Sequence, residues 1–216
     1  MDSKYWNNFY QSNPDLSKPS AFAEYVVSYL KKNNIHINLF DAGCGNGRDT
    51  NFIAHNQINI LGLDQSDLVI TENLKHVNQN MNNFLNYLPA DFTTFNYDNY
   101  SFKNSQDFFG LYSRFTWHAI NYDEEKLLLN NIMSLKKLLY LFIEARTVED
   151  SIYGDGRKVG EHEFVTSHYR RFIEPLDLIK KIKNCGFEIC EFVEGVNFSK
   201  TDHENPHLVR IIAKKK

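Results

Sequence analysis

The residues best placed for chemistry lie in the stretch FDAGCGNGRD, directly after a short apolar run. This stretch carries three glycines at alternate positions: Gly43, Gly45 and Gly47. Residues without a side chain let a ligand approach the backbone, and a glycine loop after a strand commonly receives part of a cofactor. Asp41 stands two residues ahead of the loop, and Asp64 ends the next apolar run. Together, glycines and carboxylates predict a site for a ligand with hydroxyl, amine or cationic groups.

A dinucleotide is one ligand that a glycine loop can hold. Its fingerprint is GxGxxG, in which the third glycine allows close packing of helix and strand. Here the pattern is GxGxG, and Arg48 occupies the position of that third glycine. A long side chain there crowds the approach of a pyrophosphate. An NAD-dependent oxidoreductase, or a non-catalytic cofactor-binding partner, therefore remains only as an alternative.

The combination resembles motif I of the class I S-adenosylmethionine-dependent methyltransferases. The resemblance implies that the loop glycines curl under the methionyl part of S-adenosyl-L-methionine. Asp64 then grips both ribose hydroxyls, and Gln65 lies beside the adenosine. In PADF, which resembles the next family motif, Asp91 accepts from the adenine amino group and Phe92 donates its backbone N–H.

The N-terminal segments YWNNFYQ and PSAFAEYV resemble the cap of small bacterial members of this family. In those proteins aromatic residues of a leading helix close over the cofactor, and Trp6 and Tyr10 are the matching residues here. The alternative is that both rings pack the cap against the domain. The cofactor-binding residues expected from the resemblance are Trp6, Tyr10, Asp41, Gly43, Gly45, Gly47, Arg48, Asp64, Gln65, Asp91, Phe92 and Ser113.

The fourth expected strand is followed by YSRFTWHAI, a position that lies beside the transferable methyl group in this fold. Ser113 is expected on the cofactor side. Arg114 has the fork of donors that clamps an anionic acceptor. His118 can take a proton from a hydroxyl, because its pKa lies near neutral pH. The alternative for His118 is a structural, partly buried histidine.

A second group of candidates lies in SHYRRF, within a long segment that is expected to be a substrate-side lid. On an extended chain, Tyr169 and Arg171 share one face, and His168 and Arg170 share the other. We therefore expect one arginine to point into the site and the other to pair with an acid. A surface salt-bridge network is the alternative interpretation.

The segments YSRFTWHAI, EAR and HYRRFI resemble a subgroup of methyltransferases from surface-polysaccharide (capsule and O-antigen) gene clusters. The residues carried over are Arg114, His118, His168, Arg170 and Arg171, with Tyr169 beside them. The resemblance implies O-methylation of a small or glycan-linked anionic acceptor, such as a phosphoryl or phosphoramidate group. It also implies contact with other enzymes of polysaccharide synthesis. A tellurite- or selenite-type oxyanion, or another small metabolite, is the alternative acceptor.

These residues need a scaffold, and alternating patterns of strand and helix supply one. The expected helices cover residues 21–32, 48–56, 67–77, 123–135 and 174–186. The expected strands cover 37–43, 58–64, 107–113, 137–145, 187–196 and 207–215, with a third, weaker strand in NFLNYLPADF that ends near Pro89. The pattern predicts an α/β fold with a Rossmann-like, seven-stranded, mostly parallel sheet and helices on both faces. The last two strands are expected to pair antiparallel at the sheet edge. We expect one domain, 1–216, with an N-terminal helical cap (1–34) and the lid (145–173).

Composition excludes several functions. The 216 residues carry a net charge of −3, without the basic balance of a nucleic-acid-binding protein. The longest apolar run, Leu138 to Ile143, is too short to span a membrane, and the N-terminus lacks a secretory signal, so a cytoplasmic protein is expected. The three cysteines predict no disulfide framework, and Cys44 is interpreted as a packing residue. Neither GEHEF nor DHENPH has the spacing of a metal motif, so no metal is expected.

Overall fold

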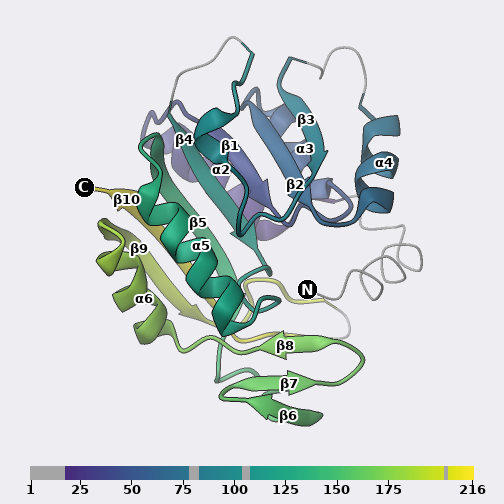
Figure 1. Cartoon of the computed structure of the whole chain (residues 1–216), viewed down its shortest axis with the longest axis vertical. Coiled ribbons are helices and arrows are strands. Elements are labelled where there is room, and N and C mark those ends of the chain that lie inside the picture. Colours follow the sequence, from purple (N-terminus) through teal and green to yellow (C-terminus); the bar gives the residue numbers. More distant parts are fainter. Residues whose placement is uncertain (1–17, 78–82, 104–107, 202–203) are drawn as a thin grey trace.

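The centre of the molecule is a seven-stranded sheet in the order β3-β2-β1-β4-β5-β10-β9 (Figure 1). The computed structural model describes residues 18–77, 83–103, 108–201 and 204–216. The strands are β1 (Asn38–Ala42), β2 (Ile60–Asp64), β3 (Leu85–Pro89), β4 (Phe109–Arg114), β5 (Leu138–Arg146), β9 (Phe187–Gly195) and β10 (Leu208–Lys215). Neighbours from β3 to β5 pair in parallel, whereas β10 is antiparallel to both β5 and β9. The predicted fold class is confirmed, with β10 inserted between β5 and β9 so that β9 forms the edge.

Helices cover both faces of this sheet. They are α2 (Ala21–Lys32), α3 (Arg48–His55), α4 (Asp67–Lys75), α5 (Tyr122–Ser134) and α6 (Pro175–Asn184), with a 3₁₀ turn, η1 (Tyr97–Asn99). Alternate strand residues point to opposite faces, which separates the core into two clusters. Phe40 packs with residues of α5 and α6, whereas its neighbour Leu39 packs with residues of α2, α3 and α4.

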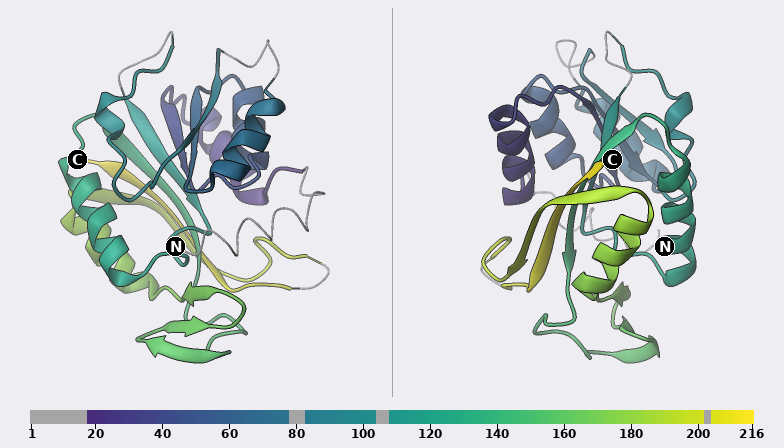
Figure 2. Two further views of the ribbon diagram at one scale, coloured as in Figure 1. Left: turned by 45° about the vertical axis from the view of Figure 1, so that its right-hand side comes forward. Right: turned by 90° about the vertical axis from the view of Figure 1, so that its left-hand side faces the viewer.

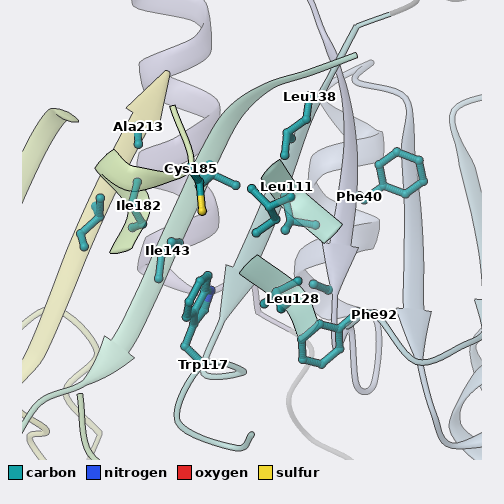
Figure 3. Close-up of a cluster of buried hydrophobic side chains, with 14 of the residues drawn as sticks. Phe40, Phe92, Leu111, Trp117, Leu128, Leu138, Ile143, Ile182, Cys185 and Ala213 are labelled. Carbon is teal, nitrogen blue, oxygen red and sulfur yellow. The ribbon is translucent and has the colours of Figure 1, made fainter. Parts of the chain in front are cut away.

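Figure 3 shows the first of these clusters, in which Phe40, Leu111 and Ile143 of the sheet meet Leu128 of α5 and Ile182 of α6. Trp117 lies in the same cluster and is fully buried. Because Trp117 belongs to the turn after β4, its burial anchors the segment that is expected to face the methyl acceptor.

Local signals begin the helices where the sequence predicts. The hydroxyl of Ser20 accepts the N–H of Ala23 and caps α2. Asn121 and Glu124 form a reciprocal capping box at the start of α5. Pro175 occupies the first turn of α6, where its missing N–H has no intrahelical partner to lose.

The predicted lid contains regular structure that the sequence analysis did not anticipate. Three short antiparallel strands, β6 (Arg157–Gly160), β7 (Glu163–Val165) and β8 (Tyr169–Arg171), form a separate sheet. It lies beyond the carboxyl ends of β4 and β5 (Figures 1 and 2). Phe164 of β7 packs its ring edge to face with those of Tyr153, before β6, and Phe172, directly after β8. In the part of the chain that is described, no helix has the length and apolar character needed to cross a membrane.

Candidate cofactor and acceptor site

The glycine loop begins where β1 ends, and the N–H groups of Gly43 and Cys44 both donate to the carbonyl of Leu63 on β2. Gly43, Gly45 and Gly47 all have positive φ, at 77°, 52° and 73°. A Cβ atom on Gly43 would lie 2.3 Å from Thr116 Cγ2. One on Gly47 would lie 2.4 Å from the hydroxyl oxygen of Tyr87. The packing of the protein and its backbone geometry therefore already require glycine at positions 43 and 47, whether or not a ligand is bound there.

Two residues that the sequence analysis missed hold the loop from outside. The side-chain amide of Asn73, on α4, donates to the carbonyl of Gly45 at 2.8 Å. The hydroxyl of Tyr87, on β3, donates to the carbonyl of Gly47 at 3.3 Å. Both lie far along the chain from the loop, and no local pattern distinguishes them from ordinary helix and strand residues.

Asp64, at the end of β2, is directed at the glycine loop. Its Oδ2 accepts the N–H of Gly45 at 3.1 Å, and its Oδ1 accepts the N–H of Ser66 at 3.0 Å. Burial raises the pKa of this carboxyl, although both backbone hydrogen bonds oppose the shift. Asp64 thus joins the glycine loop to the start of α4.

Asp41 is the second expected acid, and it is almost completely enclosed at the end of β1. Its Oδ2 accepts a 2.6 Å hydrogen bond from the hydroxyl of Thr50. Burial raises its pKa from 3.8 to about 8, and the negative charges of Asp49 and Asp64 add to the shift. The loop is therefore flanked by acids that repel one another, which is an arrangement suited to a cationic ligand.

The remaining cofactor candidates are placed as follows. Oδ1 of Asp91 accepts from both the backbone N–H and the hydroxyl of Thr93. The Phe92 ring is buried in the core, within 3.8 Å of the position that a Gly43 Cβ would occupy (Figure 3). Gln65 is partly exposed and directly follows Asp64. Trp6 and Tyr10 lie outside the described residues.

Two further cofactor candidates have partners within the protein. Arg48 opens α3, and its Nε lies 3.8 Å from Oδ1 of Asp49. Ser113 is buried at the end of β4, and its hydroxyl hydrogen-bonds that of Thr116. Since Thr116 also packs against Gly43, the turn after β4 and the glycine loop are in direct contact.

Arg114 follows Ser113 and takes part in a buried network of charges. Its Nε donates to Oε1 of Glu144 at 3.0 Å, and Nε of Arg210 donates to Oε2 of the same carboxylate at 2.7 Å. Glu144 is fully buried, whereas 16% of the Arg114 side chain is exposed. One carboxylate is thus shared by two guanidiniums, and the negative charge of Asp49 further stabilises the Arg114 cation.

His118 does not have the geometry of the expected general base. Its Nδ1 accepts the backbone N–H of Arg146 at 3.3 Å, so the proton of the neutral ring is on Nε2. Burial lowers its pKa well below the usual value, and the charges of Arg146 and Arg170 lower it further. A neutral histidine whose only lone pair is already used cannot readily accept a proton, which argues against the predicted role of His118 as a general base.

His168 has both ring nitrogens in hydrogen bonds. Nη2 of Arg170 donates to Nε2 of His168 at 2.8 Å, which leaves the proton on Nδ1, 3.2 Å from the hydroxyl of Ser167. Arg170 is close enough to His118 to depress its pKa. The structure thus brings the predicted residues Arg114, His118, His168 and Arg170 into one neighbourhood, together with Arg146, whose guanidinium is paired with Asp150 and Glu204.

Arg171 and Tyr169 are engaged by other residues of the protein, which corrects the prediction that both contact the acceptor. Arg171 is 2% exposed, and its Nη2 donates to Glu125 at 2.8 Å and to the carbonyl of Trp117 at 3.1 Å. The hydroxyl of Tyr169 donates to Glu163 on the neighbouring strand. Of the two consecutive arginines, Arg171 is the one that pairs with an acid.

Cys44 has the packing role that the sequence indicates. It is 8% exposed, and burial raises the pKa of its thiol well above the usual value. Its sulfur lies 3.0 Å from where a Cβ on Gly62 would be. As for metals, within the described ranges no three His, Cys, Asp or Glu side chains are gathered as ligands for one ion.

No family model and no curated protein sequence matches the chain, but many solved structures share its fold. One is the 1,6-didemethyltoxoflavin-N1-methyltransferase of Burkholderia thailandensis, with S-adenosylhomocysteine bound. It is 16% identical, covers 99% of this chain and 87% of its own, and has a TM-score of 0.70. An S-adenosylmethionine-dependent methyltransferase from Anabaena variabilis is 18% identical, covers 100% and 96% of the two chains, and has a TM-score of 0.67.

A third, from Clostridium acetobutylicum, is also an S-adenosylmethionine-dependent methyltransferase. It is 13% identical, covers 97% of this chain and 98% of its own, and has a TM-score of 0.68. These structures match this chain over nearly its whole length. The chain therefore has the Rossmann-like fold of the S-adenosylmethionine-dependent methyltransferases.

Proposed function

We propose that the protein is an S-adenosyl-L-methionine-dependent methyltransferase. The observation that carries the proposal is the placement of Asp64 against the N–H of Gly45, at the carboxyl end of the parallel sheet. Ligands of open α/β sheets bind at this edge. Several solved structures with the same fold hold S-adenosylmethionine or its demethylated product. This supports the same cofactor here.

The residues around the loop match the chemistry of that cofactor. Its sulfonium and ammonium groups are cationic, and the carboxyl groups of Asp41, Asp49 and Asp64 lie near the loop, where a bound cation favours their ionised forms. Asp64 is the acid for the ribose hydroxyls, with Gln65 and Asp91 on the adenosine side and Gly43 to Gly47 under the methionyl part. When bound, the cofactor supplies an electrophilic methyl carbon.

The acceptor in this proposal is an oxygen that is already anionic, such as a phosphoryl, phosphoramidate or carboxylate oxygen. Two features support it. Arg114 and Arg170 place positive charge beside the turn that follows β4, where the charge of Arg146 is offset by its ion pairs with Asp150 and Glu204. His118 Nδ1 and His168 Nε2, the nitrogens that carry the lone pairs, both accept hydrogen bonds within the protein, so neither offers a free lone pair for deprotonating a hydroxyl. An anionic oxygen needs no base.

The reaction balances without a proton transfer. The acceptor oxygen forms a bond to the methyl carbon, the carbon–sulfur bond breaks, and its electron pair stays on sulfur. Rate acceleration then depends on alignment and on exclusion of water. The role of the arginines is to orient the anion beside Ser113 and Thr116, where the turn after β4 contacts the glycine loop.

A role in surface-polysaccharide synthesis, in the cytoplasm and in contact with other enzymes of that synthesis, is the biological setting that we propose. Its support is the resemblance of the segments around Arg114, Glu144 and Arg170 to the capsule and O-antigen subgroup. In the same proposal, residues 1–34 act as a cap and residues 145–173 as the substrate-side wall.

The experiment measures transfer of tritiated methyl from S-adenosylmethionine to hexose 1-phosphate, unphosphorylated hexose and selenite. We expect transfer to the phosphorylated sugar and not to the free sugar. Calorimetry with S-adenosylhomocysteine tests the cofactor separately, with NADH as the competing ligand and Asp64→Asn as the variant that should lose binding. Transfer to the free hexose would overturn the acceptor class, and transfer to selenite alone would favour the oxyanion alternative. Binding of NADH instead of S-adenosylhomocysteine would overturn the proposal as a whole.

A further inference from the structure

We propose that Phe115 is a positioning residue for the acceptor: its ring, turned by a strained backbone, holds the guanidinium of Arg114 in the orientation that receives an anionic oxygen. This inference rests on the proposed function, since it takes Arg114 as a contact of that oxygen. Neither the glycine-loop pattern nor the family resemblance assigns Phe115 a role. The inference is carried by the backbone of Phe115, the packing of its ring and the donors of Arg114.

The first observation is the backbone conformation of Phe115, whose φ is 61°. Bulky side chains rarely adopt this left-handed region, because their Cβ atom crowds the neighbouring carbonyl. In the described part of the chain, Phe115 is the only residue with an apolar side chain in this region, and the other non-glycine residues there are Asn34, Gln57, His162 and Asn197. Such strain is concentrated at functional sites, where surrounding contacts enforce it. Glycine would make the same turn without strain, so the ring itself has to account for Phe115.

The second observation is that this conformation places the ring against Arg114. The guanidinium carbon of Arg114 lies 4.1 Å from the centre of the Phe115 ring, a distance at which a cation is attracted to an aromatic face. The ring is itself confined, because the His118 ring lies 5.1 Å away, centre to centre, and the guanidinium carbon of Arg146 lies 5.6 Å from the ring centre. The backbone N–H of Phe115 donates to the carbonyl of Glu144 at 2.9 Å. Ring and backbone together therefore fix one face of the Arg114 guanidinium.

The third observation is that the protein uses only some of the donors of Arg114. Its Nε donates to the buried carboxylate of Glu144 at 3.0 Å, and its Nη2 donates to the hydroxyl of Ser199 at 3.5 Å. The side chain is 16% exposed, and no described residue accepts a hydrogen bond from Nη1. A guanidinium is a planar fork, so its tilt decides where an anion can bind. Glu144 anchors one atom of this plane, and Phe115 sets its tilt.

The experiment is a double-mutant cycle that measures kcat/KM for methyl transfer to hexose 1-phosphate. Phe115→Leu keeps an apolar side chain but removes the aromatic face, and we expect it to lower kcat/KM about tenfold, the factor that a partly buried cation–π contact supplies. Phe115→Tyr keeps the face and should restore the parent value. In the background Arg114→Ala, adding Phe115→Leu should cause no further loss, because Phe115 acts through Arg114. A merely structural role would lower kcat/KM in both backgrounds.

The matched control is Tyr122→Leu. The Tyr122 ring also lies under an arginine, with the guanidinium carbon of Arg171 4.6 Å from its centre, but this pair is at the start of α5. The control should keep its kcat/KM for hexose 1-phosphate. All single variants at positions 115 and 122 should bind S-adenosylhomocysteine as the parent does, as measured by calorimetry. Phe115→Gly removes the ring together with the backbone strain and should lose as much kcat/KM as Phe115→Leu, so it replaces that variant if leucine prevents folding.

The outcomes separate the two proposals. If the parent protein methylates hexose 1-phosphate and a folded Phe115→Leu or Phe115→Gly variant does so with the same kcat/KM, only the role of Phe115 is overturned. An equal loss in Tyr122→Leu would likewise overturn it, because the effect would then follow from loss of packing alone. A further loss in the Arg114→Ala background would show that Phe115 does not act through Arg114. If the parent transfers no methyl group to hexose 1-phosphate, the proposed acceptor class and this inference both fail, whether or not S-adenosylhomocysteine binds.

Discussion

At the residue scale, the site is built from groups that are unfavourable for folding. Asp41 is the clearest example, because burial raises its pKa to about 8 and nearby acids oppose its ionisation. The folded protein therefore holds a proton on this carboxyl at pH values where the unfolded chain has released it. Such strain is expected where a charged ligand will later compensate for it.

This difference predicts how stability depends on pH. A carboxyl with a raised folded pKa contributes stability that is fully present below its unfolded pKa and is lost as the pH rises towards about 8. We expect the Tm of the ligand-free protein to fall as the pH rises across this range. In Asp41→Asn this fall in Tm with pH should be less steep. At pH 8.5 the variant should be the more stable protein and should bind S-adenosylmethionine more weakly. If Tm fell with pH equally steeply in the parent protein and in Asp41→Asn, this account of Asp41 would be contradicted.

At the element scale, the small β6–β8 sheet depends on a few contacts at its junction with the main domain. The backbone N–H of Arg171 donates to the carbonyl of His118 at 2.8 Å, and that of Ile173 donates to the carbonyl of Arg146 at 2.9 Å. The Arg171 guanidinium pairs with Glu125, whose other oxygen accepts from Lys181. These contacts also position the turn that carries His118.

Removing one partner of this buried pair has a predictable cost. Arg171→Met leaves Glu125 buried with only Lys181, which should lower the free energy of unfolding by about 3–5 kcal/mol. The double variant Arg171→Met/Glu125→Leu should recover part of this loss, because no buried charge is then left unpaired. Denaturant unfolding measures both effects. Affinity for S-adenosylhomocysteine should stay unchanged, and a loss of affinity in proportion to stability would show that Arg171 supports the cofactor site.

At the scale of the whole molecule, the ligand is expected to contribute to stability. The glycine loop, Asp41 and Asp64 lie at the junction of β1, β2 and α3, so a ligand bound there contacts several elements at once. A ligand that binds only the folded state stabilises it by about 2.7 kcal/mol at one hundred times its Kd.

For a protein of this size, that free energy corresponds to a rise in Tm of roughly 5–10 °C. We expect S-adenosylhomocysteine to produce such a shift in a thermal melt and NADH to produce none. Asp64→Asn should abolish the shift. If this variant responded to S-adenosylhomocysteine as strongly as the parent, the ligand would have to bind elsewhere.

Most of the fold could be predicted from the sequence because its signals are local. Alternating apolar runs identify the seven main strands, and Ser20 and Asn121 mark helix starts through caps formed within a few residues. The glycine loop and Asp64 could be recognised by spacing alone. The short strands β6 to β8 were missed, because three- and four-residue strands carry too little periodicity to stand out.

The sequence by itself therefore determined the order of strands and helices, the glycine loop and the acids that flank it. Only the tertiary structure decided which polar side chains remain available for an acceptor. Alternation along β8 predicted two faces for Arg170 and Arg171, but the acid that engages Arg171 is 46 residues away. In the same way, His118 uses its lone pair on the backbone of Arg146, 28 residues away. A side chain's partners are set by packing between distant segments, and local sequence patterns contain no information about which segments will meet.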